Sequence, residues 1–149
     1  MTRALTHLDN CYFIKSLKAI GYLCKTNTVS NTAFRGFGGP QGMLTIENIL
    51  YSVSQYLQKP IDEIRKINYY SRLNGLKTPY GQIVKNPRIE RVLKEIYKIS
   101  DYKNRIRNIK EFNLNQKNNN LPFRKGIALM PAKFGISFNK PSLNQGGAL

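Results

Sequence analysis

The sequence predicts an α+β fold with strands at both ends of the chain and about four helices between them. Two patterns support this prediction. Near each end, apolar and polar residues alternate as they do in a half-buried strand, whereas between residues 43 and 112 apolar residues recur at helical spacing. Strands at both ends would leave sheet edges unpaired, so we expect residues 1–149 to be part of a larger domain rather than a complete one.

The first 32 residues are predicted to form a short helix end followed by two extended segments. Each segment shows the period of two that is typical of a strand. The alternating residues are Tyr12 and Ile14 in the first segment, and Ile20, Tyr22 and Cys24 in the second.

The stretch Ala33–Gln41 is unusually rich in glycine and reads Ala-Phe-Arg-Gly-Phe-Gly-Gly-Pro-Gln. Glycine is favoured where the backbone takes a positive φ or approaches another group closely. A surface turn explains the glycines, but Phe34 and Phe37 on either side of Arg35 favour a flat or charged partner. The loop is not a phosphate-binding P-loop, because no Gly-Lys-Ser/Thr follows, and it does not complete the dinucleotide-binding motif.

Four helices are predicted behind this loop. The first covers residues 43–57, and Pro60 ends it and opens the second. Asn86 is the expected cap of the third helix, with Pro87 in its first turn, and Ser100 is the expected cap of the fourth. A last strand is predicted over residues 133–139, where Phe134, Ile136 and Phe138 would face the same way.

The chain is strongly basic, with a net charge of +16, and nine basic residues lie between Lys85 and Lys110. Such a charge raises nucleic acid as a partner. The bases are scattered among Ile, Leu and Asn without a run of three, which favours nonspecific adhesion to polyanions over specific nucleic-acid binding.

Neither a membrane span nor a secretory signal is predicted, so the expected location is the cytoplasm. Cys11 and Cys24 lack the spacing of a metal site, and in a reducing compartment they are expected to be small buried apolar residues.

Four separated blocks resemble the xanthine dehydrogenases, within the xanthine oxidase/aldehyde oxidase family. The blocks are Arg3–Tyr12, Cys24–Gln41, Thr78–Gln82 and Lys125–Phe138 with Asn144-Gln145. The resemblance covers nearly all of the chain in the family's order, and it implies an internal fragment of the molybdopterin-binding subunit. That family hydroxylates hypoxanthine and xanthine, as part of purine catabolism, at a molybdenum–molybdopterin centre.

The resemblance implies site residues in two of these blocks. Arg3 matches the arginine that stabilises the developing oxyanion on the purine, which favours the xanthine branch over aldehyde oxidases. Arg35, Gly36 and Phe37 match the cofactor-contacting loop, in which the main chain of Arg35 would lie against molybdenum and Phe37 would stack on the purine. Phe138 would meet the purine edge-on, and His7 carries no role from the family and is expected to be a structural histidine.

Two departures from the family limit this interpretation. Asn139 stands where xanthine dehydrogenases usually carry threonine at the purine site, which leaves the substrate open. No segment matches the family's catalytic glutamate, and no cysteine set could hold the 2Fe-2S clusters that pass electrons to FAD.

We therefore expect part of a xanthine dehydrogenase that is inactive as an isolated fragment. Two alternatives remain open from the sequence. In the first alternative, the chain is one component of a split enzyme that is active only with other subunits or segments. In the second, it is a remnant that acts as a basic nucleic-acid-binding protein.

Overall fold

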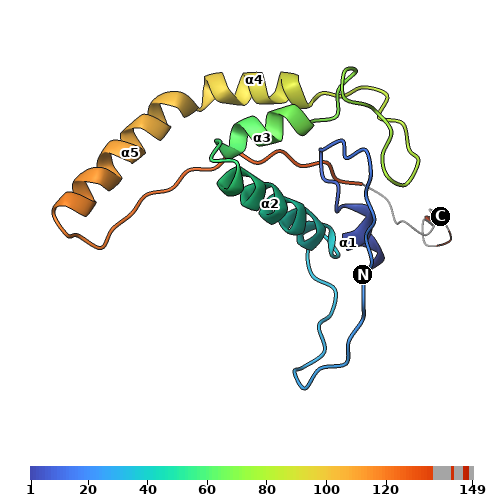
Figure 1. Cartoon of the computed structure of the whole chain (residues 1–149). Helices are drawn as coiled ribbons and strands as arrows, with labels where there is room; N and C mark the ends of the chain where they lie inside the picture. Colours follow the sequence, from blue (N-terminus) through green and yellow to red (C-terminus); the bar gives the residue numbers. More distant parts are fainter. Residues whose placement is uncertain (136–141, 143–145, 148–149) are drawn as a thin grey trace. The chain divides into compact units, whose positions relative to one another are not determined.

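The computed structural model describes residues 1–135, 142, 146 and 147. Its helices are α1 (Thr2–Thr6), α2 (Gly39–Tyr56), α3 (Ile61–Asn68), α4 (Ile89–Ile99) and α5 (Tyr102–Asn118) (Figure 1). The chain divides into two compact units, the first made of Met1–Pro87 and Ala132–Leu149 and the second of Arg88–Pro131. All residues of the predicted site belong to the first unit.

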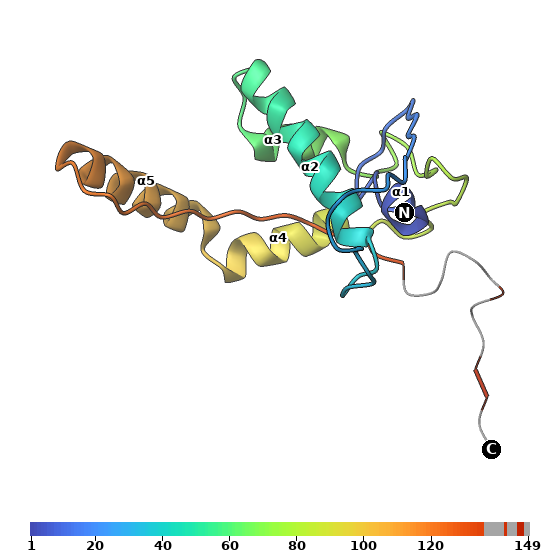
Figure 2. The ribbon, with the colours of Figure 1, turned by 90° about the horizontal axis from the view of Figure 1, so that it is seen from below.

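Close packing of α1 on α2 organises the first unit. A Cβ added at Gly42 would lie 2.1 Å from the backbone oxygen of Ala4, so only glycine allows the two helices to approach this closely. The predicted periodicity of α2 places Met43, Ile46 and Leu50 in the core, where Ile64 of α3 is also buried. Figure 2 shows α2 and α3 as successive helices beside α1.

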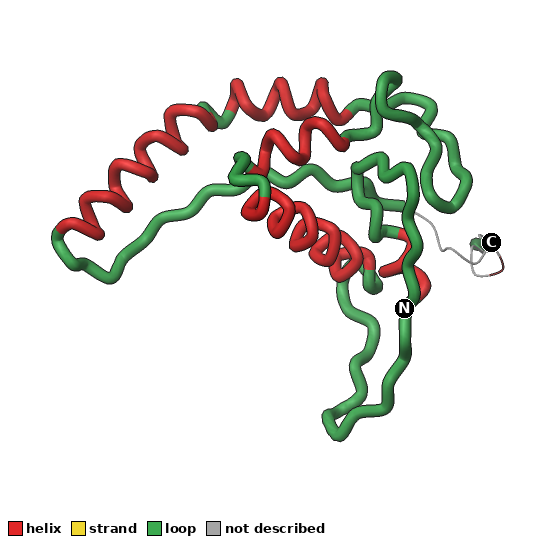
Figure 3. Tube along the Cα trace, in the orientation of Figure 1, coloured by secondary structure: helices red, strands yellow, loops and turns green. Residues whose placement is uncertain are grey.

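The prediction of an α+β fold with strands at both ends is wrong for the described residues, in which Figure 3 shows helices and loops and no strand. Tyr12 makes only an isolated antiparallel bridge to Tyr69, and Ile20 and Tyr22 lie in an exposed loop. A strand requires a neighbour that continues the hydrogen-bond ladder, and no described segment supplies one. Lys133–Gly135 is likewise a loop, and the rest of the predicted strand at 133–139 lies outside the described residues.

The four predicted helices are present, with different ends. α2 begins at Gly39, four residues before the expected start, because Gly38 takes a left-handed φ of 98° and Pro40 fits the first turn. The caps predicted at Asn86 and Ser100 are wrong. In the structure the N-cap of α4 is Arg88 and the N-cap of α5 is Asp101. The hydroxyl of Ser100 instead donates to the carbonyl of Ile96 at the end of α4.

The second unit is a pair of helices held by a small contact. Leu93 and Tyr102 are buried, and the rings of Tyr97 and Tyr102 meet edge to face with centroids 5.1 Å apart. The segment after α5 is fastened by Asn113, whose amide donates to the carbonyl of Lys125 at 2.9 Å and accepts from its N–H at 2.8 Å. None of the helices in the described part of the chain is long and apolar enough to span a membrane.

Candidate functional site

The candidate site is built where Lys133–Gly135 lies against α1 and the turn that follows it. The N–H of Gly135 donates to Nε2 of His7 at 3.0 Å, and Nδ1 of His7 lies 2.8 Å from the carbonyl oxygen of Arg3. The Arg3 guanidinium in turn donates to the carbonyl of Gly135. Residues from opposite ends of the sequence therefore meet at one place.

Phe134 fills the space between these polar groups. Its ring centroid lies 4.7 Å from that of His7, and the Arg3 guanidinium carbon lies 4.8 Å above it, in the geometry of a cation–π contact. A Cβ added at Gly39 would come within 2.5 Å of the same ring. The first residue of α2 thus has to be glycine to admit Phe134.

A second set of contacts fixes Lys133. Its backbone N–H donates to the side-chain oxygen of Asn10 at 3.0 Å, and its ammonium group pairs with Asp9, which is 1% exposed. The hydroxyl of Tyr70 donates to the same carboxylate oxygen at 2.6 Å. Lys133 also contacts the faces of Tyr70 and Tyr80, so the cation sits in a polar and aromatic pocket.

Glu47 on α2 is the centre of a buried polar network below this pocket. One carboxylate oxygen accepts from the amide of Asn10 at 3.3 Å and from the hydroxyl of Tyr12, and the other pairs with Arg65. Asn10 therefore joins the Glu47 network to Lys133. Buried charges are tolerated when they are paired and hydrogen-bonded in this way.

These surroundings shift the pKa values of the neighbouring acids upward. Burial, and then the charge of Glu47, raise the pKa of the Cys11 thiol to about 12. Burial is also the main cause that raises the pKa of Tyr12 and of Tyr70. The carboxylates that accept hydrogen bonds from these two hydroxyl groups make smaller contributions in the same direction. These three groups are therefore neutral at physiological pH.

The Gly-rich loop turns sharply in front of α2. Gly36, Phe37 and Gly38 all have positive φ values, of 89°, 56° and 98°. A Cβ at Gly36 would meet the ring of Pro40 at 2.5 Å, so this position also requires glycine. Arg35 and Phe37 are exposed, and the loop presents its backbone and these side chains outward.

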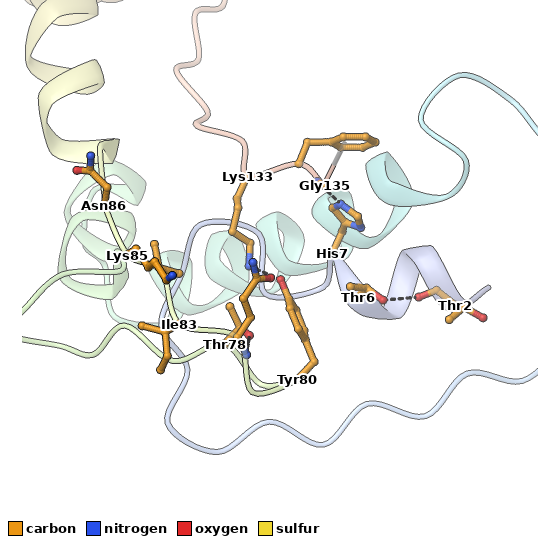
Figure 4. Close-up of a pocket in the computed structure, with 13 residues that line it drawn as sticks. Thr2, Thr6, His7, Thr78, Tyr80, Ile83, Lys85, Asn86, Lys133 and Gly135 are labelled. Carbon is orange, nitrogen blue, oxygen red and sulfur yellow. Dashed lines mark hydrogen bonds between the residues drawn. The ribbon is translucent and has the colours of Figure 1, made fainter. Parts of the chain in front are cut away.

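An open cavity of about 1030 Å³ lies beside Lys133 and His7 (Figure 4). Tyr80 and Thr78 come from the connection after α3, and Thr2 and Thr6 from α1. Ile83, Val84 and Phe134 add apolar surface to these walls, and the dashed lines of Figure 4 include the bond between Gly135 and His7.

Of the predicted site residues, Arg3 lies next to Lys133–Gly135, the segment that precedes Phe138 in the sequence. Gly36 lies near the same place, since a Cβ there would be 3.9 Å from the Phe134 ring. Arg35 and Phe37 are on the adjoining loop, while Phe138 and Asn139 lie outside the described residues. The sequence did not predict the bond between His7 and Gly135 or the Asp9–Lys133 pair. These contacts span more than 120 residues, and no local sequence pattern indicates them.

The molybdenum cofactor that the resemblance implies would be approached at this loop by backbone and rings. Among residues 1–135 and the few described beyond them, no cluster of histidine, cysteine and carboxylate side chains could ligate a metal ion. The backbone at Gly36–Gly38 takes positive φ values, in a loop whose Arg35 and Phe37 are exposed.

Comparison with known proteins finds relatives that match the chain over nearly its whole length. Residues 1–69 match the model of the molybdopterin cofactor-binding domain. The whole chain is 45% identical to xanthine dehydrogenase of Calliphora vicina and 44% identical to xanthine dehydrogenase/oxidase of Gallus gallus, and 99% of it matches nicotinate hydroxylase of Emericella nidulans at 42% identity. In each case the chain spans only 10–11% of the relative's length.

Proposed function

We propose, because this chain belongs to the xanthine dehydrogenase family and matches one segment of it, that residues 1–149 form one wall of a molybdenum–purine site. The segment would serve in the hydroxylation of hypoxanthine or xanthine in the cytoplasm. It would be part of a molybdopterin-binding domain and would be inactive by itself. The FAD and 2Fe-2S groups would be carried by parts of the enzyme outside these residues.

One observation carries this proposal. The Phe134 ring contacts both the Arg3 guanidinium and Gly39 at the end of the Gly-rich loop, although the three residues come from separate blocks of the sequence. A guanidinium held beside an aromatic ring and a glycine-rich turn suits a flat, electron-rich ligand.

In this proposal each site residue that matches the family has a defined role. Arg3 would stabilise the negative charge that develops on the purine oxygen, a role in which a fixed cation is more effective than a neutral donor. Phe37 and Phe138 would bind the purine face and edge, and the main chain of Arg35 and Gly36 would lie against the cofactor. The molybdenum–molybdopterin group would supply the oxidising centre and the oxygen that is transferred.

Relatives of similar identity differ in the substrate that their names give. A nicotinate hydroxylase is as similar to the chain as the xanthine dehydrogenases are, so overall identity does not select the heterocycle. Asn139 replaces the threonine expected at the purine site, and this position would adjust which ring atoms are hydrogen-bonded.

The split-enzyme alternative differs only in whether the rest of the site arrives on separate chains. The many exposed apolar residues of the loop before α2 favour a covering partner; among them are Tyr22 at 80%, Leu23 at 88% and Val29 at 92% exposed. Nonspecific adhesion to polyanions would follow from the net charge of +16 alone, without a folded nucleic-acid site.

Assay of the purified chain tests this proposal. We expect neither urate formation from xanthine nor retained molybdenum by elemental analysis. Xanthine turnover without added subunits would contradict it. Co-purification of a molybdenum-containing partner would select the split-enzyme form, and sequence-selective binding of RNA or DNA would select the third function instead.

A further inference from the structure

Arg3, His7 and Gly135 form a closed ring of three hydrogen bonds. The Arg3 carbonyl contacts Nδ1 of His7, Nε2 of His7 contacts the N–H of Gly135, and the Gly135 carbonyl accepts from the Arg3 guanidinium. Arg3 thus takes part twice, through its backbone and through its side chain. The direction of its guanidinium is tied to the position of His7.

The ring of contacts fixes the protonation state of His7. A backbone N–H can only donate, so Nε2 must be unprotonated in order to accept from Gly135. The single ring proton is then on Nδ1 and is donated to the Arg3 carbonyl. His7 is 4% exposed, so its ring is largely shielded from water.

Aromatic packing holds the same three residues in register. Phe134 precedes Gly135 in the chain, and its ring lies against both the imidazole of His7 and the guanidinium of Arg3. The Asp9–Lys133 ion pair fastens the residue before it. The Gly135 carbonyl is therefore placed by contacts of Lys133, Phe134 and the Gly135 N–H, and Arg3 has a fixed acceptor.

We propose that His7, as the neutral tautomer with its proton on Nδ1, is a positioning residue that holds Gly135 so that the Gly135 carbonyl orients the Arg3 guanidinium. The role of Arg3 toward a purine rests on the proposed function, but the orientation of its side chain does not. A satisfied core histidine would explain the burial of His7 without requiring any effect on Arg3. The two accounts differ in what happens to the guanidinium when His7 changes.

Nuclear magnetic resonance of the full chain tests the tautomer without any variant. His7 is the only histidine, so two-bond proton–nitrogen correlations report on this ring alone. We expect a protonated Nδ1 and an unprotonated Nε2. A ring protonated on Nε2, or one exchanging rapidly between tautomers, would overturn the proposal.

Two variants test the effect on Arg3. In His7→Leu the acceptor for Gly135 is lost, and we expect the Gly135 amide and the Arg3 side-chain N–H groups to exchange with water about tenfold faster. In His7→Gln the side-chain oxygen replaces Nε2 as acceptor and should restore much of the protection. Thr45→Ala, which removes an exposed side-chain bond on α2, is the matched control and should change neither signal.

The readout separates positioning from general stability. Amides of α2 and α3 should keep their protection in His7→Leu while Gly135 and Arg3 lose theirs. Unchanged exchange at Arg3 in that variant, or an equal loss of protection throughout the first unit, would contradict the proposal. Neither result depends on substrate or molybdenum, so a failure here is distinguishable from a failure of the proposed function.

Discussion

The carboxylate of Glu47 and the guanidinium of Arg65 face each other in the core of the first unit, with Oε2 of Glu47 2.9 Å from Nε and 2.8 Å from Nη2. Glu47 is on α2 and Arg65 is on α3, so this pair joins the two longest helices of the unit. Burial lowers the pKa of Arg65, but the hydrogen bond and charge of Glu47 outweigh that effect and raise it. Arg65 is therefore charged when the chain is folded, and Glu47 faces it as its ion-pair partner.

Replacing one member of this pair should be costly. Glu47→Gln removes the charged partner of Arg65 on α2 and leaves the buried cation beside Asp62, and we expect a loss of about 3 kcal/mol in the free energy of unfolding. Glu63→Gln is the control, because its pair with Lys59 is about half exposed on both sides. That variant should lose less than about 1 kcal/mol. Equal losses in urea titrations of the two variants would argue against the buried network.

Gly42→Ala tests the approach of α1 to α2. The new Cβ would overlap the backbone oxygen of Ala4, and backbone cannot move aside as a flexible side chain can. We expect a loss of about 2 kcal/mol and separation of α1 from α2. Gly126→Ala is the control, because nothing lies within 4 Å of its added Cβ. Similar melting temperatures for Gly42→Ala and the parent chain would show that the helices do not pack this closely.

Stability should fall as the solution becomes alkaline. The pKa of the Cys11 thiol is raised from 9.0 to about 12, so above about pH 9 the unfolded chain loses this proton before the folded chain does. The stabilising contribution is complete below pH 9 and disappears as pH approaches 12; the raised pKa values of Tyr12 and Tyr70 act in the same direction.

The measurement is the free energy of unfolding from pH 7 to pH 10.5. Cys11→Ala should flatten the alkaline decline, whereas Cys24→Ala should leave its slope unchanged, because Cys24 is exposed. A parent chain whose stability is constant up to pH 10.5 would be inconsistent with the buried thiol.

The two cysteines should also differ in reactivity. A thiol reagent such as dithionitrobenzoate is expected to modify Cys24 rapidly in the native chain, because that side chain is exposed and Cys11 is buried. Cys11 should react only after denaturant is added. Rapid modification of two thiols in the native chain would disprove the burial of Cys11.

The helices were predictable from sequence because their apolar periodicity is local. Met43, Ile46 and Leu50 of the predicted apolar series in α2 are buried, whereas Val53 is exposed. The strands were not predictable in the same way, because alternation at Ile20 and Tyr22 indicates an extended chain but does not supply a partner to pair with. The described chain leaves both residues exposed.

The candidate site also has a locally determined part, which the sequence predicts, and a part made by distant segments, which it does not. Glycines of the loop before α2 signalled a backbone constraint, and the structure locates it in the positive φ of Gly36 and Gly38. The contacts of His7 and Asp9 depend on Lys133–Gly135 folding back over more than 120 residues, and only the three-dimensional structure reveals such a distant pairing.

The most direct test uses a chimera in which the matching 149 residues of Gallus gallus xanthine dehydrogenase/oxidase are replaced by this chain. The account predicts that the chimera retains molybdenum and hydroxylates hypoxanthine or xanthine. Arg3→Met should then lower kcat by about 100-fold or more with unchanged molybdenum content, since it removes the cation that stabilises the oxyanion. Arg72→Met, at an exposed arginine, should change kcat by less than about twofold. A chimera without molybdenum or purine activity, or one in which Arg3→Met is as active as the parent, would contradict the claim that this segment forms a wall of the purine site.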